Sequence, residues 1–340
     1  MVPFSNDEIL KVSALKKYYP IEKGFLRKHV GFVRAVDGLT FDVKRGETVG
    51  LVGESGCGKT TTARLLIRAI EPTEGRILFH SSDGVLDLAT LENKQIKPVR
   101  KDIQMVFQNP YSSLNPRMPI LDIISEPLVA FGAKRKVCEE RVVELMDLVG
   151  LDPNYIRRYP HAFSGGQRQR IGIARALALN PSFVILDEPV SGLDVSIQAQ
   201  VLILLQELQE RLNLTYLFIS HDLSVVRYIS DRVAVMYMGR IVELAETDHL
   251  YEKPLHPYTS ALLSAVPDVN PDQMWLSNVL EGEVADSTRE VSGCPFAPRC
   301  KYRIALCSES PELRELGQED AIRSVACHLA GELELAGVVA

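Results

Sequence analysis

Residues 53–60 read G-E-S-G-C-G-K-T and constrain the fold of this chain more than any other stretch. They have the spacing G-x-x-x-x-G-K-T and lie between an apolar segment, residues 48–52, and a helix-compatible segment, residues 61–67. In a loop between a strand and a helix, glycines let successive backbone N–H groups face phosphate oxygens, and the helix N-terminus adds a positive dipole. A glycine-rich turn matches this spacing by chance about one time in a hundred in a chain of this length. The sequence therefore predicts a loop that binds the phosphates of a nucleotide.

Side chains of this loop have expected roles in nucleotide binding. The Lys59 ammonium is expected to reach the β- and γ-phosphates, and the Thr60 hydroxyl is expected to bind Mg²⁺. The other residues expected to contact the nucleotide are Gly53, Ser55, Gly56, Cys57, Gly58 and Thr61.

Composition limits the class of protein. The 340 residues are 46% hydrophobic and 24% charged, as in a soluble globular protein with one large domain or two smaller ones. A formal net charge of −6 argues against a nucleic-acid partner, which generally requires a basic surface. The sequence contains no run of about 18 apolar residues, so it predicts no membrane span. Residues 1–10 lack the basic and apolar regions of a signal peptide. We therefore expect a reducing compartment, in which the six cysteines do not form a disulfide framework.

The first half of the chain predicts strands followed by a helical insertion. Strands are expected at residues 9–19, 76–80 and 102–107, with two more within residues 32–52. Pro20 is expected to stop the first strand, and residues 20–31 and 81–100 are expected to be irregular. Residues 120–160 have helical periodicity, with one apolar face formed by Val142, Val143, Leu145, Met146 and Val149.

The second half predicts an α/β fold. Helices expected at residues 164–179, 195–212 and 222–229 alternate with strands expected at residues 183–186, 215–219 and 233–237. Such alternation indicates βαβ units and a mostly parallel sheet. Residues 267–293 read as a linker, and residues 294–329 read as a small cysteine-containing module.

Two carboxylates follow the apolar strand F-V-I-L, residues 183–186. Asp187 is expected at the end of this strand, where it would hold Mg²⁺ through water. Glu188 is then placed to polarise an attacking water molecule. A solvated strand end is the alternative, and for this pair alone the two readings have about even odds. The phosphate-binding loop upstream favours the functional reading.

Residues 163–167, F-S-G-G-Q, resemble the signature sequence L-S-G-G-Q of the ABC (ATP-binding cassette) class of ATPases. The residues expected to offer a second set of phosphate-binding groups at a helix N-terminus are Ser164, Gly165, Gly166 and Gln167. An ordinary capped helix is the alternative, but the R-Q-R that follows and the distance to the strand at 183–186 favour the signature. One chain cannot easily direct both groups at one nucleotide. The pattern therefore predicts two chains arranged head to tail, with each signature covering the phosphate loop of the other chain.

The resemblance to the ABC class implies further site residues, with ATP as the nucleotide. Gln108 ends a strand and fits the glutamine that reaches Mg²⁺ and the attacking water. His221 fits the histidine that contacts the γ-phosphate, and Asp194 ends the loop S-G-L-D at the dimer contact. Tyr19 fits the aromatic residue that stacks on adenine; Tyr18 is its rival, and a packing role for either is equally consistent with the sequence.

Over roughly residues 8–329, the chain resembles the ATPase subunits of oligopeptide/dipeptide-type ABC importers. The stretches that carry this resemblance are residues 108–117 (QNPYSSLNPR), 256–263 (HPYTSALL) and 294–300 (CPFAPRC). Many relatives carry a proline-rich segment where this chain reads E-V-A-D-S-T-R-E-V-S at residues 283–292. We therefore expect a more flexible linker in this chain than in those relatives.

The importer resemblance implies the architecture and the partners. The fold would be a RecA-like core with an antiparallel β subdomain and a helical subdomain at about 112–163. Residues 1–253 would form the nucleotide-binding domain, and residues 254–340 an accessory region with the four-cysteine module at 294–327. The chain would pair with a second, homologous ATPase subunit beneath two transmembrane permease subunits fed by an extracytoplasmic binding protein. It would therefore lie on the cytoplasmic face of the cell membrane as a peripheral subunit, with peptides as the first expectation for the cargo.

Four of the six cysteines lie close together near the C-terminal end, with the spacing C-x5-C-x6-C-x19-C: Cys294, Cys300, Cys307 and Cys327. Unrelated buried thiols are one reading, and disulfides are disfavoured in a reducing compartment. Four thiolates suit structural Zn²⁺, but the C-x2–4-C spacing of most zinc sites is absent. An iron–sulfur cluster accepts wider spacing, and the family resemblance implies a 4Fe-4S cluster. We favour the cluster over zinc, and we expect Arg299 and Lys301 to offset the thiolate charge.

Two other functions compete with a transport ATPase. A soluble ABC ATPase acting on ribosomes or DNA usually has two cassettes or a long coiled coil, and this chain predicts neither. A GTPase or small-molecule kinase would leave the signature without a purpose, and residues 93–96, N-K-Q-I, lack the aspartate of the guanine-reading N-K-x-D. The sequence therefore predicts an ATPase that powers solute import.

Overall fold

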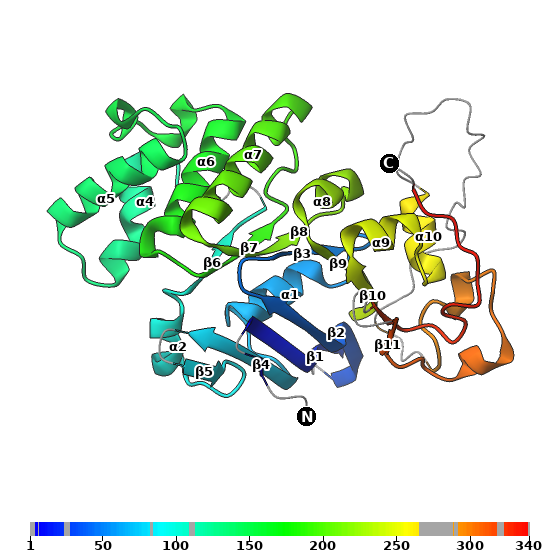
Figure 1. Cartoon of the computed structure of the whole chain (residues 1–340). Coiled ribbons are helices and arrows are strands. Elements are labelled where there is room, and N and C mark those ends of the chain that lie inside the picture. The colour runs from blue at the N-terminus through cyan, green and yellow to red at the C-terminus, as the bar shows by residue number, and fades with distance from the viewer. Residues whose placement is uncertain are drawn as a thin grey trace.

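Two β-sheets and the helices packed on them make up the described part of the chain (Figure 1). The computed structural model describes residues 4–5, 7–23, 28–81, 84–108, 113–264, 288, 292–317 and 323–338. Most of the stretch predicted as a linker, residues 267–293, lies outside these residues.

The smaller sheet is antiparallel, with the strand order β2-β1-β4-β5. Its strands are β1 (Glu8–Lys23), β2 (Lys28–Lys44), β4 (Glu74–Ser81) and β5 (Gly84–Asp87). The prediction that the first strand stops at Pro20 is wrong, because β1 continues beside β2. The pairing of β1 with β4 ends at Lys16, so at Pro20 it has a partner on one side only, where a missing N–H is tolerated.

The prediction of an irregular stretch at residues 81–100 is also wrong. β5 forms a hairpin with β4, and α2 (Asn93–Val99) follows it. The Gln95 side chain accepts a hydrogen bond from the Glu92 N–H at 3.0 Å, which caps the start of this helix. The spacing of these two residues is the sequence signal that was missed.

The larger sheet has eight strands in the order β11-β12-β10-β9-β3-β8-β7-β6. The prediction of a mostly parallel sheet is confirmed for five consecutive strands at one side of the sheet, which pair in parallel: β3 (Thr48–Val52), β6 (Ile103–Val106), β7 (Phe183–Asp187), β8 (Thr215–Ile219) and β9 (Arg232–Tyr237). Every residue of β3, β7 and β8 is buried, as expected for strands covered on both faces.

The two faces of this sheet contribute to two hydrophobic cores. In β7, Val184 and Leu186 belong to one core, and Phe183 and Ile185 belong to the other. The first core is shared with the helices on one face: α4 (Ile120–Ala130), α5 (Arg135–Leu148), α6 (Gly165–Ala176), α7 (Val195–Leu212) and α8 (Leu223–Ile229). The second is shared with α1 (Lys59–Leu66) and the smaller sheet on the opposite face (Figure 1). The predicted helical insertion at residues 120–160 corresponds to α4 and α5.

The C-terminal part of the chain extends the larger sheet. After β10 (Arg240–Glu246) come α9 (Thr247–Glu252) and α10 (Pro257–Leu263). Two short strands, β11 (Arg314–Leu316) and β12 (Arg323–Val325), then join the sheet through β10. The short 3₁₀ turns are η1 (Pro153–Tyr155), η2 (Pro160–Ala162), η3 (Leu177–Leu179), η4 (Ala297–Arg299) and η5 (Ala305–Ser308).

Substitutions of two isoleucines test the assignment of β7 to the buried centre of the fold. Ile185 in β7 is 0% exposed, whereas Ile203 in α7 is 46% exposed. We expect Ile185→Ala to lower the free energy of unfolding by about 2–5 kcal/mol, because it leaves a cavity between packed layers. The matched control Ile203→Ala should lower it by less than about 1 kcal/mol. Urea unfolding followed by circular dichroism measures both, and equal losses would contradict this core.

Candidate functional site

The loop at residues 53–58 connects the end of β3 to the start of α1 and is closely packed on both sides. Its backbone has positive φ at Gly53 (153°) and Gly58 (113°). A Cβ atom would lie 2.2 Å from the Met236 carbonyl oxygen at Gly53, and 2.2 Å from the Ala35 carbonyl oxygen at Gly58. Only glycine fits these two positions, so β9 and β2 fix the curvature of the loop.

Lys59, the first residue of α1, is buried against this loop. Its Nζ donates to the carbonyl oxygens of Gly53 at 2.7 Å and Glu54 at 3.1 Å. The hydroxyl of the next residue, Thr60, donates a hydrogen bond at 3.4 Å to Oδ1 of Asp187, the last residue of β7. The structure thus brings the predicted phosphate-binding lysine and two of the three predicted Mg²⁺ ligands, Thr60 and Asp187, into one place.

Asp187 is almost fully buried at the end of β7. Burial raises the pKa of its carboxyl group; the neighbouring Glu188 acts in the same direction, and the Thr60 hydroxyl opposes both. The candidate Mg²⁺ ligands, Thr60, Asp187 and Gln108, all carry oxygen atoms of the kind that Mg²⁺ prefers. Their chemistry therefore fits this ion.

Glu188 lies at the centre of a hydrogen-bonded group. Gln108 Nε2, just after β6, donates to Glu188 Oε2 at 2.7 Å, and His221 Nδ1, just after β8, lies 3.1 Å from Glu188 Oε1. Glu188 has a left-handed backbone, with φ of 48°, and its N–H donates to the Ile219 carbonyl at 2.8 Å. A non-glycine residue in this conformation is held there by its surroundings, and such positions gather at functional sites. The three residues predicted to be catalytic therefore meet at the ends of adjacent parallel strands.

Ser164 caps the start of α6 with a reciprocal pair of hydrogen bonds. Its Oγ accepts from the Gln167 N–H at 3.3 Å, and its own N–H donates to Gln167 Oε1 at 3.0 Å. A Cβ atom at Gly166 would lie 2.4 Å from Ile197 Cγ2, so glycine lets α6 approach α7 closely. These contacts are local, and they do not join the group around Glu188. Asp194 is exposed at the start of α7.

The two rival tyrosines of β1 have different surroundings. The Tyr18 hydroxyl donates to Asp37, and burial together with this bond raises the pKa of Tyr18 to about 12. The Tyr19 ring is 39% exposed, with Lys17 Nζ 5.0 Å from its centre. Tyr18 is thus engaged in packing, and the face of Tyr19 is the more accessible of the two.

The four C-terminal cysteines come together. Cys294, Cys300, Cys307 and Cys327 line one small cavity, beside His256 and His328 among others. Burial raises the pKa of the Cys294, Cys300 and Cys327 thiols, that of Cys327 to about 11, and the neighbouring cysteines add to the shift. Within the described residues no group of three or more His, Cys, Asp or Glu side chains has the arrangement of a metal site.

Arg299 does not serve the thiols as expected. Its guanidinium binds the Glu54 carboxylate in the phosphate-binding loop instead. This contact could not be predicted from the sequence, because two residues 245 positions apart carry no spacing signal.

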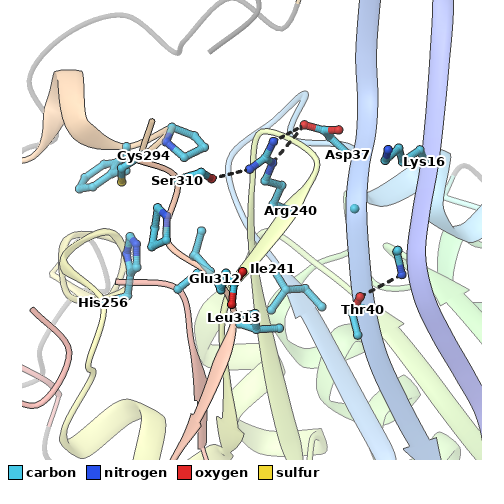
Figure 2. A pocket seen from close by; sticks show the side chains of 17 residues that line it. Lys16, Asp37, Thr40, Arg240, Ile241, His256, Cys294, Ser310, Glu312 and Leu313 are labelled. Atoms are coloured by element: carbon cyan, nitrogen blue, oxygen red, sulfur yellow. Dashed lines mark hydrogen bonds and ion pairs between the residues drawn. The ribbon is translucent and has the colours of Figure 1, made fainter. Parts of the chain in front are cut away.

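A larger cavity, of about 750 Å³, lies between the smaller sheet, β10 and the C-terminal region (Figure 2). Figure 2 shows the Arg240 side chain at its edge, bonded on one side to Asp37 Oδ2 at 2.6 Å and on the other to Ser310 Oγ at 2.9 Å. Arg240 therefore ties the C-terminal region to β2.

Family models match two parts of the chain. The model described as "ABC transporter" matches residues 36–191, and "Oligopeptide/dipeptide transporter, C-terminal region" matches residues 242–307.

No helix among the described residues has the length and apolar character needed to cross a membrane.

Whole-chain relatives and solved structures are also similar. The "Oligopeptide transport ATP-binding protein AppF" of Bacillus subtilis is 52% identical, with 97% of this chain and 99% of that protein covered. The "Probable peptide ABC transporter ATP-binding protein y4tS" of Sinorhizobium fredii is 50% identical, with 95% and 90% covered. A solved structure of the cassette MJ0796 bound to ADP and Pi matches with a TM-score of 0.61 and 26% identity, over 70% of this chain and 99% of that one. The structure of cbiO1 from Clostridium perfringens matches with a TM-score of 0.60 and 29% identity, over 72% and 91%. This chain therefore belongs to the ABC transporter family, among the oligopeptide/dipeptide-type ATP-binding proteins.

Proposed function

We propose that this chain is the ATP-hydrolysing subunit that powers the import of peptides through a membrane ABC transporter. The observation that carries the proposal is the Glu188 carboxylate, which Gln108 and His221 hold beside the phosphate-binding loop. The names of the relatives support peptides as the cargo. They also argue against the alternative of a soluble ABC ATPase acting on ribosomes or nucleic acid.

The site residues act on ATP in the following way. The backbone N–H groups of the loop and the Lys59 ammonium bind the phosphates, and the Tyr19 ring stacks on adenine. Thr60, Asp187 and Gln108 would hold Mg²⁺, which when bound neutralises charge on the phosphates. Glu188 orients the attacking water and accepts its proton, while His221 contacts the γ-phosphate. The other residues assigned to this loop are Gly53, Ser55, Gly56, Cys57, Gly58 and Thr61.

A second ATPase subunit completes each site. Ser164, Gly165, Gly166 and Gln167 would cover the nucleotide on the partner, and Asp194 would lie at the contact between the two subunits. The exposed positions of Ser164 and Asp194 are consistent with this role. The MJ0796 structures are described as dimeric, which supports a dimer of cassettes here. The importer family favours a homologous but different partner chain.

The remaining partners are membrane proteins. Two permease subunits would bind this chain at the cytoplasmic face of the membrane, where it is a peripheral subunit. An extracytoplasmic binding protein would deliver the peptide. Residues 1–253 would act as the nucleotide-binding domain, with the helical subdomain at about 112–163 passing its motion to the permease. Residues 254–340 would be the accessory region.

The accessory region would hold a 4Fe-4S cluster. Cys294 and Cys300 flank the short turn η4, Cys307 lies in η5 and Cys327 follows β12, and all four line a single cavity, which supports a shared ligand. Zn²⁺ is the alternative, since it also binds four thiolates. When bound, the cluster would crosslink these segments through its thiolate bonds.

Glu188→Gln tests the catalytic assignment. The amide keeps the shape of the side chain but cannot accept the proton, so ATP should still bind. The ATPase rate of the assembled transporter should fall by about a hundredfold or more. Glu207→Gln, at an exposed position of α7, is the control and should hydrolyse ATP normally. Near-normal hydrolysis by Glu188→Gln would exclude this glutamate as the base.

Anaerobic purification tests the cluster. We expect a brown protein with broad visible absorbance and about four iron atoms per chain. Cys307→Ser should remove the colour, whereas Cys138→Ser, a buried thiol in α5, should keep it. A colourless anaerobic preparation containing about one zinc per chain would overturn the cluster in favour of zinc.

A further inference from the structure

A buried ion pair joins the C-terminal region to the phosphate-binding loop. Arg299 Nη1 lies 2.7 Å from Glu54 Oε2, and Arg299 Nη2 lies 3.0 Å from Glu54 Oε1. The Arg299 side chain is 5% exposed and the Glu54 side chain is 22% exposed. Two parallel charge-assisted hydrogen bonds fix both the position and the orientation of the carboxylate.

The same loop residue is held through its backbone. The Glu54 N–H donates to the Tyr258 hydroxyl at 3.0 Å, and Tyr258 is fully buried in α10. Burial raises the pKa of Tyr258 above its usual range, so this hydroxyl stays neutral. The C-terminal region thus binds both the side chain and the main chain of Glu54.

An aromatic cluster holds the two anchoring residues in place. The Phe296 ring centre lies 5.4 Å from that of Tyr258 and 5.4 Å from that of Tyr237. Arg299 lies over the Tyr237 ring, with its guanidinium carbon 5.9 Å from the ring centre. Tyr237 ends β9, so the anchors rest on the larger sheet.

Glu54 is a negative charge inside a loop that binds anions. Its carbonyl oxygen accepts a hydrogen bond from Lys59 Nζ at 3.1 Å, so the residue is in direct contact with the phosphate-binding cation. An uncompensated carboxylate at this place would repel the phosphates and attract the lysine away from them. The arginine forms two hydrogen bonds to this carboxylate and neutralises its charge.

We propose that Arg299 is a positioning residue for ATP: it neutralises and holds Glu54, so that the phosphate-binding loop accepts the anionic nucleotide. The proposal rests on ATP binding at this loop, as inferred above. It assigns the C-terminal region a direct part in nucleotide affinity, although that region lies outside the cassette in sequence.

The test uses the dissociation constant for ATP of the full chain, measured by competition with a fluorescent ATP analogue. Arg299→Gln leaves Glu54 charged and should weaken ATP binding by about tenfold, more at low ionic strength than at high. Glu54→Gln removes the charge and should not weaken ATP binding. The double variant Glu54→Gln/Arg299→Gln should return to within about threefold of the original affinity.

Lys301→Gln is the matched control. Lys301 flanks Cys300 on the other side, with its Nζ 5.1 Å from the Tyr302 ring centre, and its loss should leave ATP affinity unchanged. A purely structural role for the ion pair predicts that both single variants weaken binding and that the double variant does not recover. That pattern, or unchanged affinity in Arg299→Gln, would overturn the proposal. If Arg299→Gln does not fold, the double variant decides the question. An ATP affinity of the double variant well below that of the original chain would overturn the proposal. Failure of the original chain itself to bind ATP would instead overturn the proposed function.

Discussion

Parallel pairing of β3 with β8 and of β8 with β7 brings the ends of these strands to one edge of the sheet, and the site depends on it. The phosphate-binding loop follows β3, Asp187 is the last residue of β7 and Glu188 comes directly after it, and His221 follows β8. Gln108 joins from β6, which pairs in parallel with β7. Residues far apart in sequence meet because each follows a buried strand with the same direction. Those strands are buried on both faces, so this edge is the platform that positions the site residues.

The C-terminal region is built onto that platform. Its strands β12 and β11 extend the larger sheet through β10, and Arg240 connects it to β2 through Asp37. The bonds from Arg299 and Tyr258 to Glu54 then reach the phosphate-binding loop itself. A region that reads as an accessory module in sequence is therefore in contact with the loop that we propose binds the nucleotide.

Local sequence signals predicted much of the fold and the candidate site. The helix at residues 195–212 and the strand at residues 215–219 were predicted with the observed bounds, because periodicity and apolar runs are local properties. α2 was not predicted because its N-terminal cap begins with glutamate, whereas the usual capping sequence begins with serine or threonine. The extension of β1 past Pro20 was not predicted because it depends on β1 having a partner strand on one side only at that point. The Glu54–Arg299 pair could not be predicted, since it arises from tertiary packing alone.

In the proposed mechanism, a second subunit completes the ATP site of this chain. The ATPase rate per chain, measured over a range of protein concentrations with and without the homologous subunit, tests it most directly. The signature at Ser164 and the phosphate-binding loop serve different nucleotides in this arrangement, so the chain alone should hydrolyse ATP weakly. Addition of the partner should raise the rate. A high rate that is independent of concentration, from a protein shown to be a monomer, would contradict the claim.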